Sequence, residues 1–291
     1  MWTHIPILAN EIADLLLTNL QGTYMDGTLG LGGHTKLFLS KLGPQARIFG
    51  FDKDPHALQM ATQRVNDARL TPCHASYTQA PEVLAAHGVM ALDGALFDLG
   101  LSSYQLDDPA RGFSILHEGP LDMRFDTTQT VTAAEIVNTW PLTELARIFK
   151  DYGEERRAEQ AAHAVVTARH TAQIETTAQL KYVLEPVLGP QRGRIHPATQ
   201  IFQALRIACN KELENVEQIG PMLTGLLKPG ARAAVLTFHS LEDRLIKNQF
   251  KVLSAGGGWK LVNKHTLVPS YEEIRHNSRA RSAKLRVIEK I

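Results

Sequence analysis

The sequence predicts an α/β fold in which a doubly wound parallel sheet is interrupted by a long helical insertion. Strand-like and helix-like segments alternate over the first hundred residues, as they do in proteins with a parallel sheet. The segment 105–208 has helical periodicity with little strand character, and strand signals return only after residue 230. We therefore expect a core domain at 1–104 and 209–291, split by a helical substrate-recognition domain at 105–208.

Each predicted element has a local signal of its own. Apolar residues at helical spacing within 12–20 indicate a lid helix before the first strand. Short apolar runs mark the strands, and the Lys228-Pro-Gly230 sequence marks a turn before the fifth. The predicted strands are 23–26, 47–52, 71–74, 94–99, 231–238, 259–262 and 284–289. The predicted helices are 34–42, 55–68, 132–138, 142–151, 154–169, 177–188 and 197–217.

Composition restricts the class of protein. Among 291 residues, 31 basic and 30 acidic side chains nearly cancel, so a surface for nucleic acid must be local. The two cysteines, Cys73 and Cys209, are too few for a disulfide framework and lack metal-ligand spacing, so we expect a reducing compartment and no metal. No apolar run approaches the length of a membrane span, about 18 residues. We expect a cytoplasmic protein without a membrane partner.

A glycine-rich loop follows the first predicted strand. The run Asp26-Gly-Thr-Leu-Gly-Leu-Gly-Gly-His34 leads from a strand into a helix, where backbone N–H groups converge on a ligand. Asp52 ends the next predicted strand, about 20 residues beyond the loop, where a carboxylate accepts hydrogen bonds from a ribose. The Leu96-Phe-Asp-Leu-Gly-Leu-Ser-Ser103 segment ends the fourth strand in the same way. The three strand ends together predict a nucleoside site.

The loop also indicates which nucleoside cofactor binds. A dinucleotide fingerprint has glycine at its first, third and sixth positions, but this run has Gly30, Gly32 and then Thr35. Asp26 would repel a pyrophosphate, whereas it could face the ammonium and sulfonium charges of S-adenosyl-L-methionine. A methyltransferase is thus favoured over a dehydrogenase, and over a turn that merely connects two elements.

Seven motifs, which occur in the same order as in a known family, extend over nearly the whole length of the chain. It resembles the bacterial ribosomal small-subunit (16S) rRNA cytosine-N4 methyltransferase family. The resemblance implies a class I (Rossmann-like) methyltransferase sheet with an inserted all-helical domain. It further implies S-adenosyl-L-methionine-dependent N4-methylation of a cytidine in the decoding region of 16S rRNA. The motifs are Asp26–His34, Asp98–Ser103, Leu121-Asp-Met-Arg-Phe-Asp126, Arg194-Ile-His-Pro-Ala-Thr199, Phe202-Gln-Ala-Leu-Arg-Ile207, Phe238-His-Ser-Leu-Glu-Asp-Arg244 and Arg279-Ala-Arg-Ser-Ala-Lys-Leu-Arg286.

The same resemblance implies the cofactor site. Asp26, which precedes the loop, is added to these contacts because its charge could face the positive groups of the cofactor. An aromatic face at Tyr77 could pack on the adenine; the alternative is a surface aromatic on a loop. Tyr104 and Ser278 stand where proline is common in the family, without loss of a charged group. The positions that match the family's cofactor contacts are Gly32, Gly33, His34, Asp52, Tyr77, Asp98 and Gln105.

Methylation of an exocyclic amine needs an acceptor that orients the nitrogen and receives its proton. Asp98, Ser102 and Ser103 are the candidates, and Asp98 is assigned to the cofactor first and to catalysis second. His239, Ser240 and Asp243 do not form a nucleophilic triad, because they lie within five positions at one strand end. We expect Ser240 to cap the following helix there, with His239 either facing the cleft or buried in the turn.

Local basic clusters are the candidate contacts to RNA. Arg194 and His196 precede the returning helix, while Arg279, Arg281 and Lys284 lie in the C-terminal segment. A solvated charged face is the alternative explanation. Arg124 is instead expected to pair with Asp122 or Asp126.

Two other functions remain open at this point. One is methylation of another amine, in DNA or in a protein glutamine. The other is a non-enzymatic ribosome-assembly factor that binds the cofactor, although the intact Asp26, Asp52 and Asp98 disfavour a decayed site. The predicted partner is 16S rRNA or the small ribosomal subunit, and the sequence leaves a homodimer open.

Overall fold

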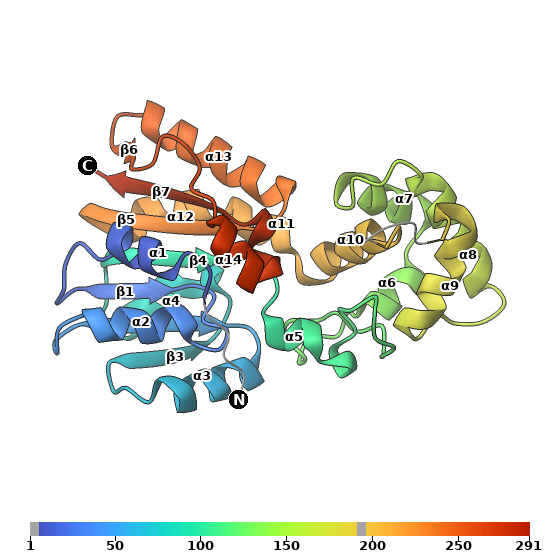
Figure 1. The fold of residues 1–291 in the computed structure, drawn as a ribbon, viewed down its shortest axis with the longest axis horizontal. Coiled ribbons are helices and arrows are strands. Elements are labelled where there is room, and N and C mark those ends of the chain that lie inside the picture. The colour runs from blue at the N-terminus through green and yellow to red at the C-terminus, as the bar shows by residue number, and fades with distance from the viewer. Residues whose placement is uncertain (1–5, 191–195) are drawn as a thin grey trace. The chain divides into compact units, whose positions relative to one another are not determined.

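The chain forms two compact units: Figure 1 shows that one is a sheet flanked by helices and the other is made of helices. The structure is a computed structural model, and it describes residues 6–190 and 196–291. Unit 1 combines Met1–Gly100 with Leu213–Ile291, and unit 2 is Leu101–Glu212. The sequence placed these divisions at 104 and 209, so a few residues at each end belong to the helical unit by their contacts.

A seven-stranded sheet forms the centre of unit 1. Its strands are β1 (Thr23–Asp26), β2 (Arg47–Asp52), β3 (Leu70–His74), β4 (Leu92–Asp98), β5 (Leu227–Thr237), β6 (Trp259–Leu261) and β7 (Lys284–Lys290). They lie in the order β3-β2-β1-β4-β5-β7-β6, with β1 to β5 parallel and β7 antiparallel to both its neighbours. The order reverses between β1 and β4, so their carboxyl ends flank the crevice where open α/β sheets bind ligands.

Helices cover both faces of the sheet. They are α1 (Ala9–Leu16), α2 (Gly33–Lys41), α3 (Pro55–Val65), α4 (Ala80–Ala86), α11 (Glu212–Glu217), α12 (Ile219–Leu226), α13 (Ser240–Ala255) and α14 (Tyr271–His276). Consecutive strand residues point to opposite faces, so Tyr24 joins one apolar core with Phe38 of α2. Met25 joins the other core with Leu84 of α4 and Ile246 of α13. Both faces are thus buried, as a parallel sheet requires.

Unit 2 is helical. Its elements are α5 (Ser103–Asp107), the 3₁₀ turn η2 (Pro109–Arg111), α6 (Ala133–Thr139), α7 (Leu142–Asp151), α8 (Ala158–Arg169), α9 (Thr177–Leu188) and α10 (Thr199–Asn210). Ile136, Phe149, Val165, Leu180 and Leu205 bring five of these helices to one apolar core. In neither unit is a described helix both long and apolar enough to traverse a bilayer.

The predicted fold class is confirmed, and several boundaries differ from the prediction. The returning helix ends at Asn210 rather than at residue 217, because Lys211 adopts a left-handed backbone with φ 52° before α11 begins. The Lys228-Pro-Gly230 sequence is not a turn before β5 but part of that strand, where its pairing with β4 shifts register between Leu92 and Gly94. Helices α4 and α12 were not predicted.

Candidate functional site

The glycine loop, which follows β1, is fixed to the two strands on either side of β1. The Gly27 N–H donates to the Leu96 carbonyl of β4, and the Leu29 N–H donates to the Phe51 carbonyl of β2, each at 2.8 Å. Gly30 and Gly32 adopt left-handed backbones, with φ 51° and 72°, which turn the chain into α2 at Gly33. A side chain at residue 32 would also come within 2.7 Å of Val65. The loop therefore has one defined shape at the end of the sheet.

Asp26 holds this loop from within. Its side chain is buried, and it accepts hydrogen bonds from the Thr28 N–H at 3.2 Å and the Thr35 hydroxyl at 2.7 Å. Burial raises the pKa of the Asp26 carboxyl, and the bond from Thr35 acts against that rise. Both carboxylate oxygens thus have partners inside the protein. A direct contact between Asp26 and a positively charged ligand stays a prediction.

Asp52 lies at the end of β2, beside the same loop. Its two oxygens accept hydrogen bonds from the Gly30 N–H at 2.8 Å and the Asp54 N–H at 2.9 Å. Burial raises the pKa of Asp52 to about 6, although these two N–H donors favour the carboxylate. Each oxygen of a carboxylate has about two acceptor positions, so one on each remains for a further donor, and its contact with a ribose stays a prediction.

Asp98 and His34 face each other across the loop. Asp98 ends β4 and its backbone N–H donates to the Thr28 hydroxyl at 2.6 Å. The Nε2 atom of His34 lies 3.5 Å from Oδ2 of Asp98. Both ring nitrogens of His34 and Oδ1 of Asp98 are buried without a hydrogen-bond partner among the described residues. Buried polar atoms without partners are rare in native proteins, so this cluster fits a polar ligand that would supply them.

Tyr77 is buried rather than exposed on a loop. It belongs to the 3₁₀ turn η1 (Tyr77–Gln79) and is 8% exposed. Its ring meets that of Phe97 edge-on, with centroids 5.3 Å apart. Protein atoms thus cover most of the ring, and packing of the remainder on an adenine stays a prediction.

The predicted residues that follow β4 belong to unit 2. Ser102 caps α5: its hydroxyl accepts a hydrogen bond from the Gln105 N–H at 3.2 Å, and its own N–H donates to the Gln105 side chain at 3.3 Å. Gln105 is buried. The Ser103 side chain lies outside the part of the chain that the structure describes. Ser102 thus has a structural role as a helix cap, whether or not it meets a substrate.

Known proteins resemble the chain over its full length. The MraW methylase family matches residues 1–291. The chain belongs to the MraW methylase family. It is 56% identical over 291 residues to the ribosomal RNA small subunit methyltransferase H of Elusimicrobium minutum, covering 100% of this chain and 99% of that protein. Proteins of the same name from Coprothermobacter proteolyticus and Geobacter sp. are 44% and 42% identical, each over 99% of this chain and 96% and 98% of their own lengths. The cofactor of this methylase is S-adenosyl-L-methionine.

The turn after β5 in this methylase is a helix cap and not a catalytic triad. His239, not Ser240 as predicted, is the cap: its Nδ1 accepts a hydrogen bond from the Glu242 N–H at 3.4 Å, because the helix begins one residue earlier than expected. Asp243 accepts hydrogen bonds from Arg286 at 2.7 Å and Lys284 at 3.2 Å. These two cations hold the pKa of Asp243 below its usual range despite burial.

The residues predicted to contact RNA differ in their exposure and in their charge partners. Arg279 and Arg281 are exposed on the 3₁₀ turn η3 (Ser278–Ser282), whereas the charge of Lys284 is balanced by Asp243. His196 is buried and accepts a hydrogen bond from the Ala198 N–H at 3.1 Å, and burial lowers its pKa. Arg194 lies outside the described residues. The two arginines on η3 are thus exposed, and their contact with phosphates stays a prediction.

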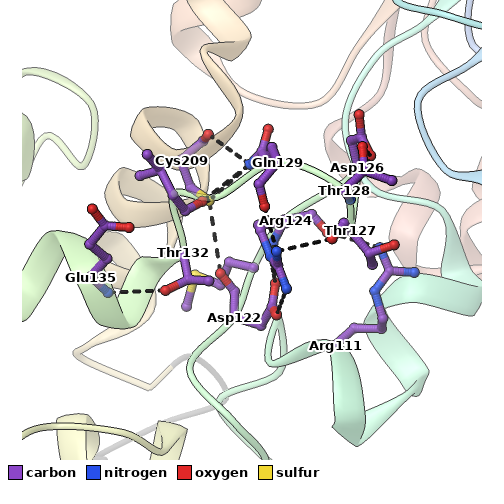
Figure 2. Close-up of polar contacts among 12 residues, drawn as sticks. Arg111, Asp122, Arg124, Asp126, Thr127, Thr128, Gln129, Thr132, Glu135 and Cys209 are labelled. Carbon is purple, nitrogen blue, oxygen red and sulfur yellow. Dashed lines mark hydrogen bonds and ion pairs between the residues drawn. The ribbon is translucent and has the colours of Figure 1, made fainter.

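The sequence predicted only part of the hydrogen bonding of Arg124, and it did not predict the exposed Tyr271. Arg124 pairs with Asp122 as predicted, through bonds of 2.8 and 2.7 Å, but it also donates to the carbonyls of Thr127 and Gln129 (Figure 2). Tyr271, 84% exposed on α14, had no signal, because a single tyrosine in a polar stretch forms no pattern.

Proposed function

We propose that this methylase transfers a methyl group to the exocyclic N4 nitrogen of a cytidine in the decoding region of 16S rRNA. The name of its relatives, ribosomal RNA small subunit methyltransferase H, supports small-subunit ribosomal RNA as the substrate. The amine is supported by Asp98, whose Oδ1 is buried without a partner at the end of β4. Because ribosomal RNA of bacteria lies in the cytoplasm, we propose that the protein acts there.

The cofactor fits the residues at the carboxyl ends of β1, β2 and β4. S-adenosyl-L-methionine supplies a methyl group on a positively charged sulfur. Asp52 would accept hydrogen bonds from the ribose, since each of its oxygens has one internal donor and one free acceptor position. Gly32, Gly33 and His34 would line the loop beside it, because α2 begins at Gly33 and the first N–H groups of a helix have no partner within the helix. Tyr77 and Gln105 complete the proposed set.

The chemistry proposed for Asp98 is orientation of the amine and acceptance of its proton. The lone pair of an exocyclic cytosine nitrogen is shared with the ring, so positioning is the main task. A carboxylate oxygen at hydrogen-bond distance would turn the lone pair toward the methyl group and then take the released proton. His34, at 3.5 Å from the other oxygen, is placed to hold this carboxylate in position.

Substitution of Asp98 tests this assignment. We expect Asp98→Asn, which keeps the shape and removes the charge, to lower the rate of methyl transfer more than Ser102→Ala does. The measurement is single-turnover methylation of small-subunit rRNA at saturating cofactor, so that weaker cofactor binding does not mimic slower chemistry. Near wild-type turnover of Asp98→Asn would exclude the acceptor role. A methyl group found on a ring carbon or a ribose oxygen would exclude the proposed reaction altogether.

RNA is proposed to bind through the arginines of η3. Arg279 and Arg281 are exposed, and exposed Tyr271 on α14 offers an aromatic face of the kind on which unpaired bases stack. Replacing both arginines with alanine should weaken RNA binding and reduce the slope of log affinity against log salt by about 1.4 to 1.8. Replacing Lys247 and Lys251, two exposed residues of α13, changes the net charge equally and is the matched control. An equal change in both variants would leave only the net charge as the cause.

The same experiments separate the alternatives. Methylation of DNA or of a protein glutamine in place of rRNA would identify another amine as the substrate. Cofactor binding without methylation of any of the three would favour an assembly factor. Mass spectrometry of rRNA nucleosides from cells with and without the protein gives the decisive comparison.

A further inference from the structure

A short N-terminal segment, Pro6–Leu8, lies between the glycine loop and the C-terminal helix α14. A Cβ atom on Gly33 would come within 3.4 Å of the Pro6 ring, so the ring rests on the first residue of α2. Ile7 and Leu8 are 5% and 3% exposed, and they share one apolar core with Leu29 of the loop. Ile274 of α14 packs against the same core. The segment therefore contacts both the loop and α14.

The backbone of this segment is held in an uncommon conformation at Leu8. Its φ of 52° is left-handed, a region that residues with a side chain rarely adopt. The Leu8 N–H donates to Oε1 of Glu273 at 2.8 Å, and the Leu8 carbonyl accepts from the Ile12 N–H at 2.8 Å. The bond from Ile12 belongs to the first turn of helix α1. The bond to Glu273 therefore ties the Pro6–Leu8 segment to α14.

Glu273 is itself well positioned for this bond. It lies in the first turn of α14, where its N–H donates to the hydroxyl of the cap residue Ser270 at 3.1 Å. Among the described residues its carboxylate forms no ion pair, and the Leu8 N–H is its partner. The half-buried carboxylate of Glu273 bonds the backbone amide of a residue 265 positions away in the sequence. Such a long-range bond indicates that Glu273 holds the N-terminal segment in place.

We infer that Glu273 is a positioning residue for the cofactor site. By bonding the Leu8 N–H it holds Pro6 on Gly33, and so it fixes the first turn of α2, where His34 lies beside Asp98. Loss of this bond would let the segment move away from the loop, and the cofactor would dissociate faster. This inference rests on the proposed placement of the cofactor at the glycine loop.

Three substitutions test it. Glu273→Ala removes the acceptor, and Glu273→Gln keeps a carbonyl oxygen at the same place. Glu272→Ala removes an exposed carboxylate from the preceding residue of the same helix. Calorimetry should show S-adenosyl-L-methionine binding about five- to tenfold weaker for Glu273→Ala, since binding would then have to order about one residue of the released segment. Binding by Glu273→Gln and Glu272→Ala should stay within about twofold of wild type. In turnover assays only the KM for the cofactor should rise in Glu273→Ala, with kcat at saturating cofactor unchanged.

A merely structural role gives a different pattern. A bond that only stabilises the fold would lower the melting temperature of Glu273→Ala, and the cofactor affinity of the folded protein would not change. Hydrogen exchange of the peptide that covers residues 6–16 should be faster in Glu273→Ala than in wild type, which shows that the segment is released. If the segment is released in Glu273→Ala but the cofactor affinity is unchanged, the inference is wrong. It is also wrong if Glu273→Gln loses as much cofactor affinity as Glu273→Ala does.

Asp52→Ala separates this inference from the proposed function. If Asp52→Ala weakens cofactor binding and Glu273→Ala does not, only the positioning role of Glu273 fails. If Asp52→Ala also binds normally, the cofactor lies elsewhere and the proposed site fails with it.

Discussion

The glycine loop of unit 1 and the segment 121–129 of unit 2 are both irregular, yet they are built in opposite ways. In the glycine loop two carboxylates accept hydrogen bonds from backbone N–H groups, and glycines take the left-handed positions. In the other segment the Arg124 guanidinium donates to a carboxylate and to carbonyls (Figure 2). Met123 of that segment adopts φ 59° with its side chain buried.

The two regions also differ in whether their buried polar atoms have hydrogen-bond partners. Asn210 bonds both sides of the segment, accepting from the Phe125 N–H at 2.7 Å and donating to the Met123 carbonyl at 2.7 Å. The glycine loop instead leaves His34 and Asp98 with buried atoms that no described residue bonds. A segment that satisfies its own polar groups is scaffold, whereas one that leaves them open needs a ligand.

The largest expected effect is on the scaffold segment. Arg124→Ala should destabilise the protein by about 3 kcal/mol, because it leaves the mostly buried carboxylate of Asp122 without its partner. Cofactor affinity should not change. Chemical unfolding gives the stability, with Arg147→Ala as control, since the pair of Arg147 with Glu144 is about half exposed. A weaker cofactor affinity in folded Arg124→Ala would contradict the division between scaffold and site.

The converse is expected at the glycine loop. Asp52→Ala should weaken cofactor binding by about 1.5 to 3 kcal/mol, the range for hydrogen bonds to a charged group, with a smaller effect on stability. Calorimetry measures the affinity, and Asp14→Ala, which removes an exposed carboxylate of the same unit, is the control. Unchanged affinity would remove the ribose assignment.

The raised pKa of Asp52, about 6, predicts a pH dependence of cofactor binding. Protonation removes acceptor capacity, so affinity at pH 5 should be about tenfold weaker than at pH 7.5, and Asp52→Asn should lose this dependence. The stability of the protein without cofactor should change in the opposite sense. A carboxyl whose folded pKa is raised contributes stability that is fully present below its unfolded pKa of 3.8 and is lost as pH rises through about 6. Calorimetry and thermal unfolding between pH 4 and 7.5 test both signs.

The smallest effect on stability is expected from replacing a glycine that has a left-handed backbone. Gly30→Ala places a side chain at φ 51° with no close neighbour, so it should cost about 1 kcal/mol of stability. Gly88→Ala, at φ 70° in open space, should cost the same and is the matched control. Only Gly30→Ala should also weaken cofactor binding, since the Gly30 N–H orients Asp52. Equal cofactor affinity in both variants would show that this bond is dispensable.

Local signals predicted the sheet well and long-range contacts poorly. The bounds of β1 and β2 follow from short apolar runs that end in Asp26 and Asp52, and both agree with the structure. The Lys228-Pro-Gly230 sequence has the chemistry of a turn, but it forms an irregularity within β5, because Leu227 before it and Arg232 after it both pair with β4. The bonds of Asn210 and of Glu273 join positions far apart in the sequence, so no local pattern could reveal them.

The split sheet also has a consequence for synthesis on the ribosome. Strand β4 pairs on one side with β1, which precedes it, and on the other with β5, where Asp98 meets Leu236. The whole helical insertion is translated between these two strands, which takes on the order of 10 s at about 5–20 residues per second. During that interval an apolar strand edge has no partner from its own chain, and such edges promote aggregation. Nascent chains paused before residue 227 are therefore the form of this protein with the greatest need for a chaperone.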